Sequence, residues 1–230
     1  MTMGLILLAV TALALFFPFG RSAFKGLGLP TWGAFMVLLA FVIGVIVPDI
    51  RLGRFGYMSV GGFILPIVAS ILLAIRLGAR RGLGMGLLAM VAVVAITTGL
   101  LLIMPTKNMG LRFLTSVVIG LVTGVVSFLI ARSRAASTFA VLSGIPVGNL
   151  IFSLLDYNFI SGAEIVLGWS VVFNAFVLSF MVALAIAELA RSSRSVVSDR
   201  EARRRNLGYE AGRDRNFDEE NYDDIDNDLF

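Results

Sequence analysis

The sequence contains no cysteine and no histidine among its 230 residues. The absence of cysteine excludes disulfides, thiolate catalysis and cysteine-bound metals or clusters. The absence of histidine removes the usual general base and the commonest metal ligand. We therefore expect this chain to hold no metal and no cofactor, and not to be an enzyme.

Charge is also scarce. Only 15% of the residues are charged, against about 25% in an ordinary soluble domain. Apolar residues make up 58% of the chain, and the mean hydropathy is +0.92. These values exclude a soluble globular protein, and they exclude a disordered one, which would be charged and poor in aliphatic residues. The composition indicates a polytopic membrane protein.

Seven stretches lack any charged side chain and are about as long as the 20 residues that a helix needs to cross the hydrocarbon layer. They cover residues 1–20, 26–48, 55–75, 82–106, 113–131, 135–155 and 165–187. Lipid favours helices because the backbone must satisfy its own hydrogen bonds, and a transmembrane barrel would show alternating segments of about ten residues. The sequence predicts an all-α transmembrane bundle of about seven helices over residues 1–190, followed by a disordered tail over residues 191–230.

The first run is expected to be a retained helix rather than a signal peptide. It has no basic residue before its apolar stretch, and Phe17-Pro18-Phe19-Gly20-Arg21 is not a small-x-small cleavage site. Loops after odd-numbered runs hold seven Lys or Arg residues, and loops after even-numbered runs hold four. Since basic loops stay in the cytoplasm, we expect a multi-pass protein of the cell membrane with its N-terminus outside and its C-terminus in the cytoplasm.

The tail begins basic and ends acidic, and nothing in it can form a core. Its last thirteen residues contain seven carboxylates, a pattern typical of interaction tails, so the acidic part is expected to bind a basic cytoplasmic partner. Its basic part is expected to contact anionic lipid head groups, at about 1 kcal/mol per residue. The residues concerned are Arg191, Arg194, Arg203, Arg204 and Arg205. Nucleic acid is not an expected partner, because most basic residues lie in short gaps between apolar runs.

Ionisable groups avoid the middle of the runs. Asp49, Asp156 and Glu164 fall at run ends on the predicted outer side, and Glu188 lies three residues before Arg191, a spacing that favours an ion pair along a helix. Coupled transporters usually place a carboxylate nearer the midplane. The sequence therefore argues against coupled transport, while a channel or a passive carrier stays open.

The candidate ligand-binding residues are neutral: Asn149, Ser153 and Asn174. The alternative for each is a hydrogen bond between helices. Two runs also contain glycine and proline together, at Gly61-Gly62-Phe63-Ile64-Leu65-Pro66 and at Ser143-Gly144-Ile145-Pro146-Val147-Gly148-Asn149. Such segments are either simple kinks or the discontinuous helices in which transporters place their binding sites.

Three pairs of glycines have the spacing that lets membrane helices approach closely. They are Gly82 and Gly86, Gly120 and Gly124, and Gly144 and Gly148. We expect them to pack helices within the bundle. A contact with a second protein is the alternative.

Gly61-Gly62-x-x-x-Pro66, Ser143-Gly144 and Val172-Phe173-Asn174-Ala175-Phe176 resemble a family of bacterial and archaeal multi-helix membrane proteins known as a domain of unknown function, number sixteen-fourteen. The resemblance covers roughly residues 25–190. It implies that the last two helices carry aspartates in Gly-Ala-Asp and Phe-Asp-Gly, as an intramembrane aspartyl protease would. The matching positions here are Ser153 and Asn174, which cannot act as carboxylate acid or base. The resemblance therefore implies the fold rather than an activity.

The residues favour a non-catalytic integral membrane subunit or scaffold of a membrane protein complex. Its expected partners are membrane lipids and other membrane proteins, with the charged tail used for docking. The alternative is a small-solute carrier or channel with a site near the interrupted third and sixth helices. An intramembrane hydrolase rests on the resemblance alone.

Overall fold

The computed structural model describes Ile6, Ala9 and residues 31–78, 82–104, 108–160 and 164–190. The contacts within the chain divide it into two units, residues 1–188 and 189–230. The fold below is that of the first unit. Most of the first apolar run lies outside the described residues, as do all five tail arginines named above.

Five helical segments are long and apolar enough to cross a membrane: Val60–Gly78, Leu83–Ile103, Met109–Ala131, Arg134–Asn158 and Ser170–Ala190. The chain is therefore a helical membrane protein. The second apolar run contains α3 (Thr31–Ile46), whose 16 residues span only about 24 Å at 1.5 Å per residue. The described residues thus give five spanning helices and one shorter apolar helix, and the first predicted helix is untested.

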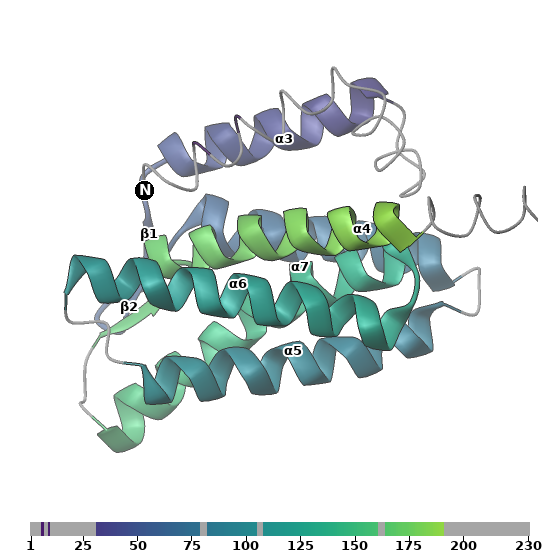
Figure 1. Cartoon of the computed structure of the whole chain (residues 1–230). Coiled ribbons are helices and arrows are strands. Elements are labelled where there is room, and N and C mark those ends of the chain that lie inside the picture. The colour runs from purple at the N-terminus through teal and green to yellow at the C-terminus, as the bar shows by residue number, and fades with distance from the viewer. Residues whose placement is uncertain are drawn as a thin grey trace, which may run out of the picture. The chain divides into compact units, whose positions relative to one another are not determined.

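The first span combines a π-helix, η1 (Val60–Ile64), with α4 (Leu65–Gly78). The next two are α5 (Leu83–Ile103) and α6 (Met109–Ala131). The fourth combines α7 (Arg134–Leu155) with a second π-helix, η2 (Asp156–Ile160). The fifth, Ser170–Ala190, is the yellow-green helix of Figure 1 and is called the 170–190 helix.

Helix α7 lies at the centre of the bundle, in contact with α4, α5 and α6 (Figure 1). Small residues let α5 approach it, because Gly144 meets Val93 and Gly148 meets Thr97. The residue numbers of these contacts rise together along both helices, so α5 and α7 run parallel. Helix α6 and the 170–190 helix also run parallel, since Gly120 meets Ala175 and Gly124 meets Ser179.

The expectation of an entirely α-helical chain is corrected by a small three-stranded sheet. Strands β1 (Ile50–Arg51) and β2 (Gly56–Met58) pair antiparallel, and β2 pairs parallel with β3 (Ile165–Leu167). Pro48, Gly53 and Gly56 discourage a helix in the first of these loops. The two loops instead satisfy part of each other's backbone hydrogen bonds. We call this end of the bundle the sheet end.

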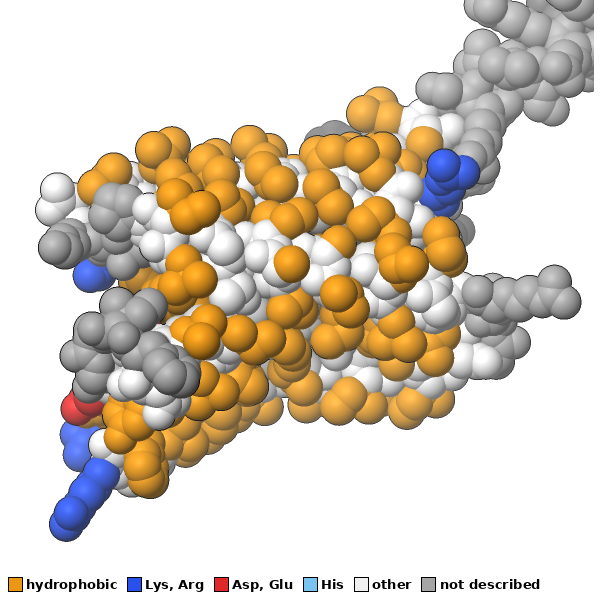
Figure 2. Space-filling view, turned by 90° about the horizontal axis from the view of Figure 1, so that it is seen from below, with side chains coloured by type: hydrophobic (Ala, Val, Ile, Leu, Met, Phe, Trp, Pro, Cys, Tyr) orange, Lys and Arg blue, Asp and Glu red, His pale blue; other side chains and the backbone are white. Residues whose placement is uncertain are grey.

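Charged side chains lie at the ends of the helices, and apolar ones cover the middle. Figure 2 shows this on one face, where arginine or lysine side chains project at both ends of a largely hydrophobic surface. Exposed apolar residues of α5 and α6, such as Val91 and Leu129, contribute to the apolar surface of the bundle. This distribution matches a bundle surrounded by lipid tails, with its charges at the two polar interfaces.

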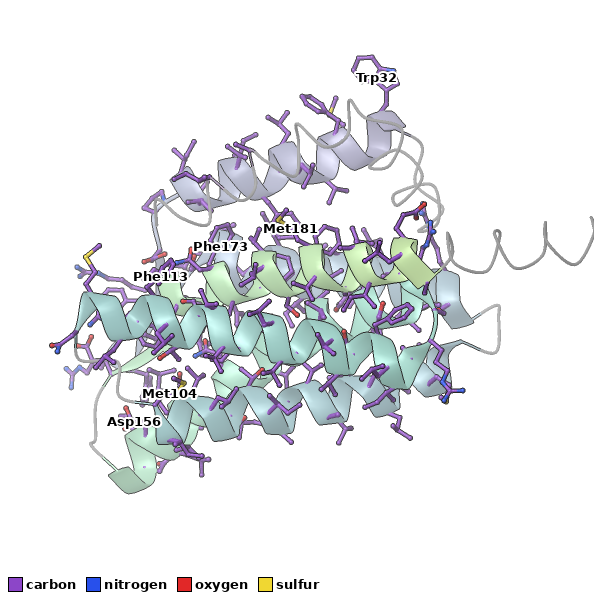
Figure 3. The ribbon with its side chains drawn as sticks, viewed as in Figure 1. Trp32, Met104, Phe113, Asp156, Phe173 and Met181 are labelled. Carbon is purple, nitrogen blue, oxygen red and sulfur yellow. The ribbon has the colours of Figure 1, made fainter. Side chains whose placement is uncertain are left out.

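Aromatic side chains hold α3 against the bundle. The Phe41 ring lies 5.2 Å from the ring of Phe176, which also neighbours Phe173 at 6.4 Å between centroids. Phe41 and Phe173 are buried in the same core cluster. Figure 3 shows Phe173 on the side of the 170–190 helix that faces α3, while Trp32 points away from the bundle. Helix α3 therefore buries one face and presents the other to its surroundings.

Candidate functional site

At the sheet end, the candidate polar residues of α7 meet the starts of two other helices. We call this region the junction and define it by Ser59, Gly62, Asn149, Ser153 and Gly168. Strand β2 leads through Ser59 into η1, and β3 leads through Gly168 towards the 170–190 helix. Because β2 and β3 are paired in parallel, both helices begin side by side.

Ser59 starts the π-helix and ties it to the neighbouring loop. Its Oγ accepts a hydrogen bond from the Gly62 amide at 3.3 Å, as an N-cap residue does. Its own amide donates to the Leu167 carbonyl at 2.9 Å. The Gly61-Gly62 break expected in the third run is thus a π-turn that passes directly into α4, with Pro66 tolerated in the first turn of α4.

Glycine is required where Gly62 meets Gly168. A Cβ added at Gly62 would lie 2.1 Å from the Gly168 carbonyl oxygen, which is far inside van der Waals contact. Gly168 also has a φ of +74°, in the region that favours glycine. Beside this contact, a Cβ at Gly61 would lie 2.8 Å from the backbone of α3 at Gly44. The junction is therefore a direct backbone contact between three segments that are far apart in sequence.

Asn149 and Ser153 hold the same loop from the side of α7. Asn149 is fully buried, and its Oδ1 accepts a hydrogen bond from the Gly168 amide at 2.9 Å. Its Nδ2 donates to Ser153 Oγ at 3.5 Å, and Ser153 Oγ donates to the Val166 carbonyl at 3.3 Å. The structure thus brings together two of the three predicted ligand-binding residues, and their polar atoms are occupied by the protein itself.

Asn174, the third predicted ligand-binding residue, lies one turn into the 170–190 helix. Its Oδ1 is buried and has no hydrogen-bond donor within the described residues. Ala175 beside it packs on Gly120 of α6. A buried acceptor without a donor costs free energy, so this oxygen is the polar atom of the three candidates that remains available to a water or a solute.

The glycines predicted to pack helices fall into two groups. Five of them lie where a Cβ would be 2.6–3.1 Å from a neighbouring helix: Gly86, Gly120, Gly124, Gly144 and Gly148. Gly82, at the start of α5, has only Leu77 near it, at 3.2 Å. The contacts of these five glycines join α5 to α7 and α6 to the 170–190 helix, all inside this chain.

Of the two alternatives for the sixth run, a simple kink or a discontinuous helix, the structure does not have the discontinuous helix. Helix α7 continues through Pro146 from Arg134 to Leu155. Pro146 is buried between Gly144 and Gly148, which pack against α5. The close packing of α7 on its neighbours compensates for the one backbone donor that proline removes. Only the third run therefore has an irregular helix at its glycines and proline.

The sequence did not indicate the ion pair at the opposite end of the bundle. It suggested an ion pair of Glu188 with Arg191, which lies outside the described residues; within them, Glu188 pairs with Arg134, at the start of α7. The two side chains are 12% and 13% exposed. This pair links the first turn of α7 to the last turn of the 170–190 helix. A local spacing rule could not find it, because the partners are distant in sequence.

Breaking this ion pair is expected to destabilise the bundle. In Glu188→Gln, the Arg134 guanidinium stays largely buried without its counter-charge, which costs about 3 kcal/mol. The double variant Arg134→Met, Glu188→Leu removes both charges and should recover most of that loss. Thermal unfolding in detergent measures both. Equal destabilisation by the single and double variants would contradict this account.

The polar groups of the junction form hydrogen bonds within the chain. Within the described residues, no group of three Asp or Glu side chains lies close enough to hold a metal ion. The hydroxyls of α6 donate to carbonyls of their own helix, as Thr123 does to Ile119, and Thr123 Oγ1 also shares a hydrogen bond with Ser179 Oγ at 2.9 Å, in which Ser179 donates. These hydrogen bonds align the helices with one another.

Comparisons of the chain with protein-family models, with curated proteins and with solved structures find no match. The resemblance to the multi-helix family therefore stays a prediction. The fold and the junction together define a helical membrane protein with a closely packed interior.

Proposed function

We propose that the chain is a non-catalytic membrane subunit or scaffold, which presents its bundle to other membrane proteins and its tail to a cytoplasmic partner. The observation that supports this best is the use of polar groups at the junction. Asn149 and Ser153, the strongest ligand-binding candidates, are engaged by Gly168 and Val166. Side chains occupied in this way fix a shape, which is what a scaffold requires.

The surface of the bundle is consistent with this role. Large apolar side chains on α3, α4, α5 and α6 are exposed, including Met36, Ile75, Val91 and Leu129. In the membrane such faces contact either lipid tails or the helices of a partner, and van der Waals packing drives helix association there. A scaffold therefore needs no polar site within the bilayer to bind its partners.

The proposed orientation places the sheet end outside the cell and the tail in the cytoplasm. In the sequence, the loops over 76–81 and 132–134 hold five arginines, while the loops over 49–54 and 107–112 hold four basic residues. The excess of basic residues in the first pair of loops supports this orientation. A reporter fused after Phe230 should be active only in the cytoplasm.

Co-purification tests the scaffold role. The full chain, isolated in mild detergent, should bring down a defined membrane partner together with a cytoplasmic one. A chain ending at Ala190 should retain the first and lose the second. A second variant keeps the length of the tail but replaces its seven final carboxylates with amides: Asp218, Glu219, Glu220, Asp223, Asp224, Asp226 and Asp228. A protein that isolates alone with and without its tail would contradict the proposal.

A small-solute carrier is the second candidate, because the buried Asn174 Oδ1 has no donor within the described residues. On this proposal a solute donates a hydrogen bond to Asn174 near the π-turn of η1, since π-helices are frequent at functional sites. Asn174→Leu would then abolish solute flux into vesicles that contain the protein. Unchanged flux would exclude Asn174 from the pathway.

A further inference from the structure

The β1–β2 hairpin has features that the scaffold role does not use. Its turn is held by two backbone hydrogen bonds, from Leu52 N to Gly56 O at 2.8 Å and from Phe55 N to Leu52 O at 3.3 Å. A third bond, from Ile165 N to Phe55 O at 2.8 Å, ties the turn to β3. The tip is therefore a preformed structure fixed to the junction.

This rigid tip holds an aromatic side chain and two cations away from the protein. Phe55 is 59% exposed, and Arg51 and Arg54 are both exposed. The Arg51 guanidinium lies over the Tyr57 ring, 5.7 Å from its centroid. Neither arginine forms an ion pair with any part of the chain that the structure describes. The hairpin thus presents two unneutralised guanidinium groups beside an exposed phenyl ring.

The hairpin also lies at a defined depth. It connects α3 to the span that begins at Val60, and in a bilayer the end of a spanning helix lies where the hydrocarbon layer gives way to the head groups. Aromatic rings are favoured at that boundary, and arginines near it extend their charge to the polar side. An exposed phenyl ring is costly in water, but it is stable against acyl chains.

We propose that this hairpin, residues 50–58, binds the head group of an anionic phospholipid. Arg51 and Arg54 would contact the phosphate, a ligand that matches the guanidinium geometry, and Phe55 would pack on the upper part of the acyl chains. A lipid offers phosphate and hydrocarbon next to each other, as the hairpin offers cations and phenyl. An acidic peptide would satisfy the arginines but leave Phe55 in water.

Native mass spectrometry of the full chain, stripped of lipid in detergent, tests the proposal with phosphatidylglycerol and phosphatidylcholine as probes. Wild type should bind phosphatidylglycerol more tightly than phosphatidylcholine. The variant Arg51→Gln, Arg54→Gln should lose about fivefold in affinity per arginine, or about 25-fold in all. The control Arg132→Gln removes an exposed arginine at the end of the bundle opposite the sheet. This variant should keep the wild-type affinity for phosphatidylglycerol. Equal affinity in wild type and the double variant would overturn the proposal.

Two further measurements separate a lipid from other anions. Inorganic phosphate or an acidic peptide, added at the lipid's concentration, should not displace phosphatidylglycerol, and displacement by either would count against a lipid site. Because the chain has no cysteine, Phe55→Cys accepts a single spin label. In vesicles of phosphatidylglycerol and phosphatidylcholine, the label should collide more often with oxygen than with a water-soluble nickel chelate. The reverse preference would place residue 55 in water and refute the proposal.

Discussion

Replacing Gly62 with alanine is expected to destabilise the protein by about 3 kcal/mol or more, or to prevent it from folding. The new methyl group would lie 2.1 Å from the Gly168 carbonyl oxygen. The methyl carbon is fixed to the backbone of η1, and the oxygen is part of the backbone at Gly168, so neither can rotate away and the two segments must move apart. That movement would also strain the hydrogen bond from the Ser59 amide to Leu167. Thermal unfolding in detergent, followed by circular dichroism, measures the loss.

The matched control is Gly99→Ala. Gly99 is also a glycine within a spanning helix, but a Cβ there would meet nothing within 4 Å. Alanine has the higher helix propensity, so this variant should be as stable as wild type or up to about 1 kcal/mol more stable. If both variants lost stability equally, the cause would be general to membrane glycines, and the proposed contact between Gly62 and Gly168 would be wrong.

Removing the Asn149 carboxamide should have the second largest effect. In Asn149→Leu the Gly168 amide, which now donates to Asn149 Oδ1 at 2.9 Å, becomes a buried donor without an acceptor. Leaving such a donor unpaired costs about 1–3 kcal/mol, and a poor fit of leucine at a fully buried site adds to this. We expect a total of about 3 kcal/mol, measured by the same unfolding experiment.

Two other variants distinguish this hydrogen bond from a general effect of losing an asparagine. Asn158 is exposed, and its Nδ2 donates to the Leu154 carbonyl at 2.8 Å, so Asn158→Ala should cost less than about 1 kcal/mol. Ser153→Ala removes the weaker contact with Val166 and should give an intermediate loss. A stable Asn149→Leu protein that binds a solute less well would instead favour the carrier.

The sequence predicted the membrane helices well, because an uncharged run of about 20 residues has few other uses. The runs over 82–106, 113–131 and 135–155 correspond closely to α5, α6 and α7. The run over 26–48 contains α3, which the structure describes from Thr31, and residues 26–30 lie outside the described residues. The sheet was missed because its strands of two or three residues are too short to show alternation.

The junction was only partly predictable. Asn149 was noticeable because an amide in hydrocarbon needs a partner, but that partner is the Gly168 amide, and backbone groups carry no signal in a sequence. Gly61-Gly62 indicated a break, yet Gly168 lay within the run over 165–187 and nothing in the sequence singled it out. Arg134 and Glu188 were both visible as charges at the ends of runs, but only the packing of α7 beside the 170–190 helix makes them a pair.

The contact between Gly62 and Gly168 also has a consequence for biosynthesis. The chain leaves the ribosome from its N-terminus, so α3 and α4 are made well before the segment that locks them in place. Until Gly168 and the helix after it emerge, Gly62 of η1 lacks its backbone contact and β2 lacks β3 beside it. The buried face of α3 also has no Phe173 or Phe176 to cover it. The early helices must therefore wait in the bilayer, shielded by lipid or by the insertion machinery, and the native arrangement can close only after the segment through Phe176 has been made.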